Sequence, residues 1–110
     1  GHYSIDACVT SQFEQQARVL AGQPLGSSDP LAASVMLNIL GDIWFQAGEQ
    51  AAEPAWSRAL QAPTAKLHLY GKAEARRGRK MGHVTCLGAD RAQAERSAAQ
   101  VAAALGIAYP

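Results

Sequence analysis

Hydrophobic and polar residues follow three short extended patterns along the chain, and each pattern predicts a β-strand. Residues 33–41, ASVMLNILG, are apolar on both faces apart from Asn38, which predicts a strand at the centre of a sheet. Residues 65–72, AKLHLYGK, alternate between polar and apolar side chains, as expected for a strand with one face toward a core. Residues 80–88, KMGHVTCLG, give the third strand, which we expect to form a hairpin with the second.

Apolar residues with helical spacing occur on both sides of these strands. Residues 10–22 are capped by Ser11 and residues 90–106 by Asp90, each followed three positions later by Glu or Gln. A shorter helix is expected at residues 54–60. The last helix carries a stripe of apolar side chains that we expect to be buried: Ala94, Ala98, Val101, Ala102 and Leu105.

The order of these elements predicts an α+β fold, in which a small antiparallel sheet has packed helices covering one face. Proline, glycine, serine and aspartate in residues 23–30, QPLGSSDP, mark a linker between the first helix and the first strand. The sequence shows no internal repeat, so the residues that follow this linker are expected to form one small domain.

Composition and charge narrow the class of protein. Hydrophobic residues make up 48% of the 110 residues and charged residues 17%, which is typical of a folded globular domain. The net charge is only +1, so nucleic acid or a membrane surface would have to bind a local patch. Neither a signal peptide nor a membrane span is expected. Cys8 and Cys86 could form one disulfide, but two reduced, buried thiols suit a cytosolic-looking chain better.

Positive charge is concentrated in the segment that joins the second and third strands. Half of the ten Lys and Arg residues lie here: Lys72, Arg76, Arg77, Arg79 and Lys80. Gly78 and Gly82 lie in the same segment, where glycine permits tight turns and close approach of a ligand to the backbone. Glu74 is the only acidic residue nearby.

Three interpretations of this basic segment are open: a solvated loop, a surface through which a stand-alone module binds nucleic acid or another anionic partner, or a socket for one phosphorylated small molecule. Arginine forks pair bidentately with phosphate oxygens, which favours the socket. A nucleic-acid surface usually needs a wider footprint and stacking aromatic rings, and Tyr70 is the only aromatic residue here. The salt dependence of binding distinguishes the two, because several phosphates give a steep slope and one monoester a shallow slope.

The histidines give a second, weaker signal. His68 and His83 are expected to lie opposite each other across the hairpin, where they could bind a ligand or shuttle a proton. Hydrogen-bonded, half-buried histidines are the commoner outcome for such a pair. Because His2, His68 and His83 are scattered along the sequence, we expect no structural metal site. No Ser-His-Asp set, phosphate-binding glycine loop or carboxylate pair predicts a catalytic residue.

Three segments together carry a resemblance to a known family: GHYSIDACVTSQFEQQAR at 1–18, SVMLNILG at 34–41 and LHLYGKAEARRGRKMGHV at 67–84. In this order and spacing they resemble the C-terminal third of the 5-(carboxyamino)imidazole ribonucleotide synthases, the ATPase subunits of phosphoribosylaminoimidazole carboxylase. These enzymes are ATP-grasp ligases of purine biosynthesis. The resemblance covers nearly the whole chain, and the block around the basic segment is its most specific part.

This resemblance implies that the intact enzyme is cytoplasmic and uses ATP, magnesium and bicarbonate to carboxylate aminoimidazole ribonucleotide. The chain would be its C-terminal part, with residues 1–28 as the tail of the ATP-grasp module, a strand remnant plus a helix, and residues 29–110 as a C-terminal sheet-and-helix domain. In the family, the magnesium-binding acids and most ATP contacts precede the position of Gly1. We therefore expect the chain alone to be inactive and to bind no cofactor. The resemblance implies no nucleic-acid or membrane partner, and the intact enzyme could be a homodimer.

The resemblance also implies which residues bind substrate. Lys72 and Arg79 match the family residues at the phosphate of the ribonucleotide, and Arg76 and His83 are weaker candidates for the same site. Their expected role is electrostatic positioning, so no catalytic residue or metal ligand is assigned. Arg77 stands where the family often has proline, and we assign it no ligand contact. Gly1 and His2 would then be native sequence and not the remnant of a tag.

Overall fold

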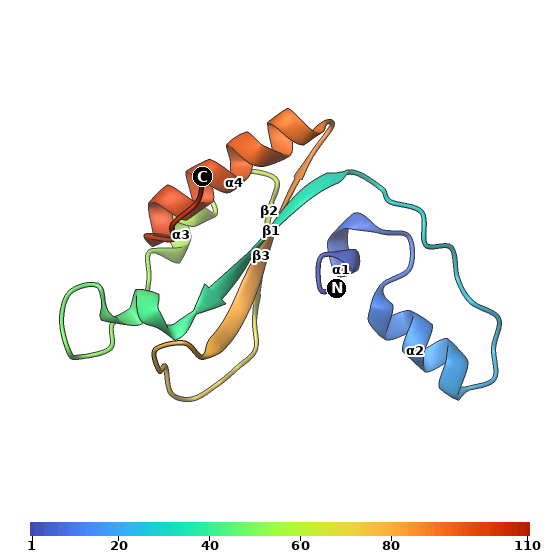
Figure 1. Cartoon of the computed structure of the whole chain (residues 1–110), viewed down its shortest axis with the longest axis horizontal. Helices are drawn as coiled ribbons and strands as arrows, with labels where there is room; N and C mark the ends of the chain where they lie inside the picture. The colour runs from blue at the N-terminus through green and yellow to red at the C-terminus, as the bar shows by residue number, and fades with distance from the viewer.

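The computed structural model describes all 110 residues and has the expected α+β architecture. Three strands form one sheet, and the helices lie around it (Figure 1). The elements in chain order are α1 (Ser4–Ala7), α2 (Gln12–Leu20), β1 (Ala33–Leu40), the 3₁₀ helix η1 (Gly41–Phe45), α3 (Trp56–Ala59), β2 (Ala65–Leu69), β3 (Lys80–Gly88) and α4 (Arg91–Leu105). No helix combines the length and the apolar character needed to cross a membrane.

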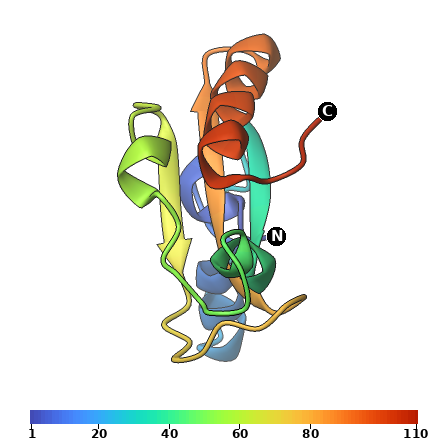
Figure 2. The same ribbon diagram turned by 90° about the vertical axis from the view of Figure 1, so that its left-hand side faces the viewer.

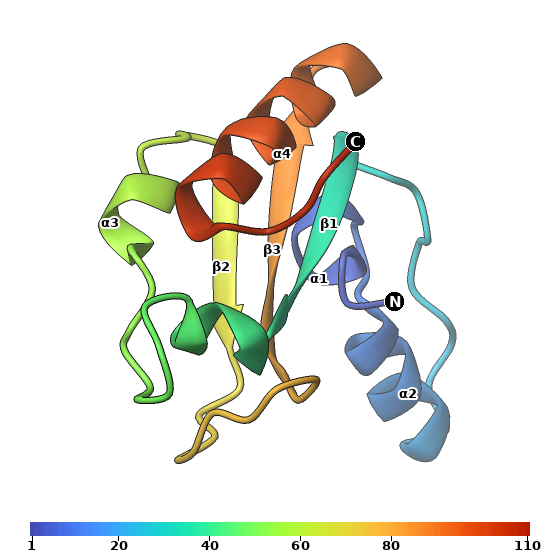
Figure 3. The ribbon, with the colours of Figure 1, turned by 60° about the vertical axis from the view of Figure 1, so that its left-hand side comes forward.

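The sheet is antiparallel, with strand order β1-β3-β2 (Figure 3). The hairpin of β2 and β3 is confirmed, and its register places His68 directly opposite His83. The prediction that β1 is central was wrong, because β3 occupies the centre and β1 an edge. The sequence of β3 does not look like that of a central strand because it contains the polar residues His83 and Thr85, although both are fully buried. A run of apolar residues therefore misidentified the central strand.

The two faces of the sheet are covered by different helices. Helix α4 lies across one face, and the short helix α1 lies on the opposite side (Figures 1 and 2). The prediction of helices on one face is thus incomplete. Helix α1 has only four residues, which is too short for an apolar repeat to reveal it. Its position matters because it covers the part of β3 that carries His83.

The main core lies between α4 and the sheet. All five residues of the predicted stripe on α4 are buried, as expected: Ala94, Ala98, Val101, Ala102 and Leu105. They pack in or beside a cluster that includes Leu37, Ile39, Val84 and Cys86 from the strands. The helix ends at Gly106, whose φ of 75° is the left-handed C-terminal conformation that glycine adopts readily.

Both cysteines are buried free thiols, so no disulfide joins Cys8 and Cys86. Burial raises the pKa of the Cys86 thiol, which keeps it protonated and unreactive at neutral pH. Of the two interpretations that the sequence left open, the structure therefore has the reduced pair.

We expect Asp90→Ala to lower the free energy of unfolding by about 1 kcal/mol, because Asp90 caps α4. Its carboxylate accepts a hydrogen bond of 2.8 Å from the backbone N–H of Gln93. The Gln93 side-chain oxygen in turn accepts one of 2.6 Å from the N–H of Ala89. Urea denaturation followed by circular dichroism measures the change. Asp90→Ser keeps a capping oxygen and should retain most of the stability; an equal loss in both variants would contradict a capping role.

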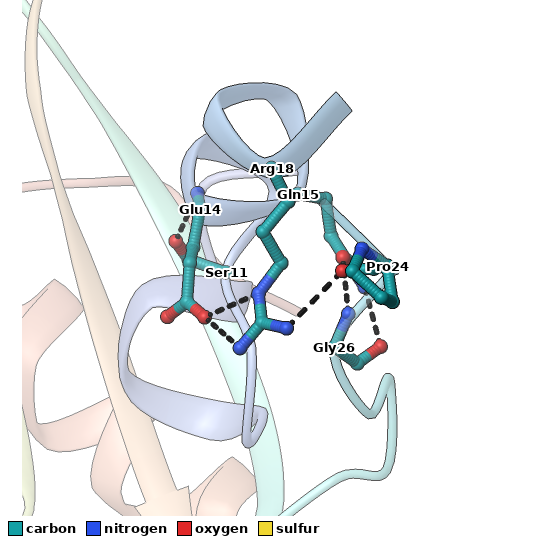
Figure 4. A network of polar contacts seen from close by, with 6 residues as sticks. All are labelled: Ser11, Glu14, Gln15, Arg18, Pro24 and Gly26. Atoms are coloured by element: carbon teal, nitrogen blue, oxygen red, sulfur yellow. Dashed lines mark hydrogen bonds and ion pairs between the residues drawn. The ribbon is translucent and has the colours of Figure 1, made fainter. Parts of the chain in front are cut away.

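The linker between α2 and β1 is held against α2 by side chains (Figure 4). The Gln15 amide makes two hydrogen bonds with the backbone of Gly26, one to each of its polar groups. Arg18 pairs with Glu14 at 2.8 Å and also donates to the carbonyl of Pro24. Further along, the N–H of Leu31 donates to the carbonyl of Ala7. The predicted linker therefore has defined anchors, although it contains no regular secondary structure.

Candidate functional site

The basic loop, residues 70–79, joins β2 to β3 and leaves the sheet at the end nearest η1 (Figure 3). Three contacts hold it against η1. The N–H of Gly41 donates to the carbonyl of Arg79 at 2.8 Å, and the N–H of Gly78 donates to the carboxylate of Asp42 at 2.6 Å. The guanidinium of Arg77 lies 5.2 Å from the centre of the Phe45 ring. The loop is therefore docked on the preceding element, although most of its residues remain exposed to solvent.

Two glycines make this docking possible. Gly78 has a φ of 78°, and a hydrogen bond from the N–H of Arg79 to the carbonyl of Arg76 closes a tight turn around it. Gly41 lies so close to the loop that an added Cβ would sit 1.9 Å from the carbonyl oxygen of Arg76. The sequence indicated a role for Gly78, but nothing in it indicated the contact between Gly41 and the loop.

Lys72 and Arg79 keep their charges free of any carboxylate partner. The Lys72 ammonium donates to the backbone carbonyl of Lys80, and the Arg79 guanidinium donates to the carbonyl of Glu74 at 2.8 Å. Arg76, by contrast, lies 3.6 Å from the carboxylate of Glu74 and is part-neutralised. Carbonyl oxygens orient the first two cations without cancelling their charge, so these two are the better donors for an anion.

A hollow of 380 Å³ lies between η1 and the basic loop. Its walls include Trp44 and Phe45 from η1, Lys72 and Glu74 from the loop, and Met81 from β3. This size falls within the range of small-molecule sites, and the lining combines apolar side chains with one lysine and two glutamates, Glu53 and Glu74. Of the predicted substrate-binding residues, Lys72 lines this hollow, whereas Arg76, Arg79 and His83 do not.

His83 lies apart from the other three predicted residues. It is fully buried beneath Tyr70, whose hydroxyl lies 3.0 Å from its Nδ1, while Lys72 reaches only the ring of Tyr70, at 5.9 Å. The structure thus brings Lys72, Arg76 and Arg79 into one loop and connects His83 to it only through Tyr70. Any effect of His83 on that loop must be indirect.

Around His83, the fold gathers a cluster of polar and aromatic side chains, the histidine cluster: His2, Asp6, His68, Tyr70 and His83. His68 stacks on His83 with ring centres 4.6 Å apart, and the His2 ring lies 5.3 Å from His83. The Nε2 atom of His68 lies 2.6 Å from a carboxylate oxygen of Asp6. Burial, reinforced by His68 and His2, lowers the pKa of His83, so this imidazole is neutral at pH 7. Burial also raises the pKa of the Tyr70 hydroxyl.

The sequence predicted only part of this cluster. The strand register gave the pairing of His68 with His83, but His2 and Asp6 were missed because they belong to α1 and the residues before it. Only the tertiary fold brings that segment onto the sheet.

With this geometry in place, comparison with known proteins decides the family. The family model described as "Phosphoribosylaminoimidazole carboxylase C-terminal domain" matches residues 34–97, which is more than half of the chain. The chain belongs to this family. The match spans β1, the basic loop, β3 and the first half of α4. The three segments that suggested the resemblance thus identified the family correctly.

Individual proteins that are similar to the chain in sequence or structure support the same family assignment. The chain is 46% identical over 85 residues to N5-carboxyaminoimidazole ribonucleotide synthase of Bacillus subtilis, covering 77% of this chain and 20% of the relative. The crystal structure of the synthetase from Thermotoga maritima aligns with a TM-score of 0.83 and 41% identity, covering 94% of this chain and 28% of that one. The Aspergillus clavatus synthase, solved with ADP and 5-aminoimidazole ribonucleotide, aligns with a TM-score of 0.79 and 33% identity, covering 96% and 28%.

The coverage is strongly asymmetric. The chain spans about a fifth of the curated relative, as its 20% coverage shows, and little more than a quarter of either solved structure. What those longer proteins do therefore depends on far more sequence than the 110 residues described here.

Proposed function

We propose that this chain is part of an ATP-dependent ligase that carboxylates aminoimidazole ribonucleotide with bicarbonate in purine biosynthesis. Membership of the carboxylase C-terminal domain family carries the proposal. The Aspergillus clavatus relative supports the choice of substrate, because it was solved with the ribonucleotide bound and aligns over 96% of this chain.

Within that ligase, Lys72 and Arg79 would bind the phosphate of the ribonucleotide. Both cations lack a carboxylate partner and are oriented by backbone carbonyls, so their charge is available to an anion. Arg76 would add a weaker contribution because Glu74 lies within 3.6 Å of it. His83 would act indirectly, by fixing the Tyr70 hydroxyl beneath the loop. These residues position the substrate and leave bond making to other groups.

The exposed apolar residues support the proposal that this chain packs against another part of the ligase. Helix α2 has no buried residue, and Phe13 and Leu20 on its apolar side are 44% and 80% exposed. Most of the large exposed hydrophobic residues lie in the first 31 positions: Tyr3, Ile5, Val9, Phe13, Val19, Leu20, Leu25 and Leu31. Such a concentration is typical of a surface that packs against another part of a protein. The division into residues 1–28, as the tail of the ATP-grasp module, and residues 29–110 follows from this proposal.

The proposal assigns ATP, magnesium and bicarbonate to the intact ligase and to no residue of this chain. Magnesium prefers several oxygen ligands in octahedral geometry. The one group of close metal-ligating side chains here holds a single carboxylate and two imidazoles, Asp6, His68 and His83, which does not fit that preference. A cytoplasmic location and a homodimer of the intact ligase complete the proposal.

The proposal is tested by assaying the chain and the longer protein that contains it side by side. The longer protein should release phosphate from ATP only when bicarbonate and aminoimidazole ribonucleotide are both present. The 110-residue chain should release none. Activity of the longer protein with an unrelated acceptor, and none with the ribonucleotide, would contradict the proposal, as would ATP turnover by the chain alone.

A further inference from the structure

The histidine cluster contains an arrangement that neither the family nor the proposed function accounts for. One ligand atom each of Asp6, His68 and His83 lies within 4.8 Å of the other two. These residues come from three elements, α1, β2 and β3, and Asp6 lies 62 positions before His68 in the sequence. We propose that Asp6, His68 and His83 form a binding site for a divalent transition-metal cation of the zinc class.

The type of ligand favours this class of cation. Two imidazoles and one carboxylate suit zinc, cobalt and nickel, and suit magnesium or calcium poorly. A zinc ion holds histidine nitrogens at about 2.0–2.1 Å, which places tetrahedral ligand atoms about 3.3 Å from one another. The ligand atoms lie within 4.8 Å of one another, and binding would require the stacked rings of His68 and His83 to rotate apart so that both point at the cation. A water molecule could complete the fourth position, because Asp6 and His68 are only part-buried.

A second observation points independently to a ligand. The Nε2 atom of His83 is buried without any hydrogen-bond partner, and the residue is 0% exposed. An unpaired buried polar nitrogen is costly, so its retention calls for a partner. The other ring nitrogen, Nδ1, already has one in the Tyr70 hydroxyl at 3.0 Å. When Nδ1–H donates to that hydroxyl, Nε2 carries the free lone pair that a metal requires.

Tyr70 and α1 define what the site would do. Metal-bound histidines commonly use their second nitrogen in a hydrogen bond that fixes tautomer and ring orientation, and Tyr70 provides that contact for His83. Because Asp6 belongs to α1 and the histidines to the sheet, a bound cation would connect α1 to β2 and β3. The site would stabilise the face of the sheet that α4 leaves uncovered, in proportion to the free cation concentration.

Zinc titration of the full chain tests this inference. Isothermal titration calorimetry with zinc chloride should give one ion per chain, and zinc should raise the melting temperature. Asp6→Asn and His68→Gln should each weaken zinc binding by at least about tenfold, and Tyr70→Phe by about tenfold through loss of the outer contact. His83→Gln is informative only if it folds, since His83 is fully buried. The two part-buried positions therefore carry the test.

The control is His2→Phe, which keeps an aromatic ring beside His83 and removes both nitrogens of His2. It separates the proposed site from chelation by the amino group of Gly1 and the neighbouring imidazole. We expect zinc affinity in His2→Phe to stay within about threefold of the parent, and the visible absorption of bound cobalt(II) to persist. The inference is overturned if the parent binds no zinc. It is also overturned if Asp6→Asn and His68→Gln both bind zinc like the parent, and loss of binding in His2→Phe would then place the zinc at the N-terminus.

Discussion

Replacing Arg79 by alanine in the intact ligase is expected to raise the KM for aminoimidazole ribonucleotide roughly 10- to 100-fold and to change kcat little. A hydrogen bond between charged groups contributes about 1.5–3 kcal/mol, which corresponds to that range. The guanidinium is already oriented by the carbonyl of Glu74, so the wild-type residue needs little rearrangement to bind phosphate. A similar rise is expected for Lys72→Ala. Initial-rate kinetics with varied ribonucleotide at saturating ATP and bicarbonate measure both effects.

The matched control is Arg77→Ala, which removes the same charge from the same loop. Its guanidinium lies over the Phe45 ring, and its removal leaves the two hydrogen bonds that dock the loop on η1, so the KM should change less than about threefold. Arg79→Lys keeps the charge but loses the planar fork, and should give an intermediate KM. If Lys72→Ala and Arg79→Ala both leave the kinetics unchanged, neither residue binds the phosphate. If Lys72→Ala, Arg79→Ala and Arg77→Ala all weaken ribonucleotide binding equally, then the net charge of the loop determines the affinity and there is no specific phosphate socket.

Features determined by neighbouring residues could be predicted from the sequence. Ser11 and Asp90 cap their helices with the expected bonds, and Gly106 ends α4, because each depends only on a few adjacent positions. The pairing of His68 with His83 could also be predicted, since a hairpin fixes its own register. The charged residues of the candidate site lie within that hairpin, which is why Lys72, Arg76 and Arg79 could be grouped before the structure was known.

Features that depend on distant segments could not be predicted. The position of β1 at the edge depends on how β3 pairs with both other strands. Both faces of β3 are buried, but one of them carries the polar residues His83 and Thr85. The approach of α1 to the sheet involves residues more than 60 positions apart, such as Asp6 and His68. No pattern of neighbouring residues in the sequence predicts a contact between segments so far apart. The docking of the basic loop on η1 was missed for the same reason, although it decides how the phosphate donors are held.

That docking gives the second large expected effect: Gly41→Ala should displace the basic loop. The new methyl group would lie 1.9 Å from the carbonyl oxygen of Arg76 and 2.6 Å from its carbonyl carbon, so the backbone itself must move. We expect a loss of about 1–3 kcal/mol in the free energy of unfolding, the usual cost of overpacking. The KM for the ribonucleotide should rise at least about tenfold, because Arg79 would lose its hydrogen bond from the N–H of Gly41.

Two further variants separate this steric effect from a general weakening of the loop. Asp42→Ala removes only the acceptor for the N–H of Gly78, an exposed contact, and should cost less than about 1 kcal/mol with a smaller rise in KM. Adding Arg76→Ala to Gly41→Ala should not restore binding, because the collision is with the main chain of Arg76 and its side chain is not involved. Chemical denaturation and initial-rate kinetics on the same preparations measure both quantities. If Gly41→Ala binds the ribonucleotide with the parental KM, the docking of the loop on η1 does not position the phosphate donors, and Lys72 and Arg79 must be oriented by the substrate itself.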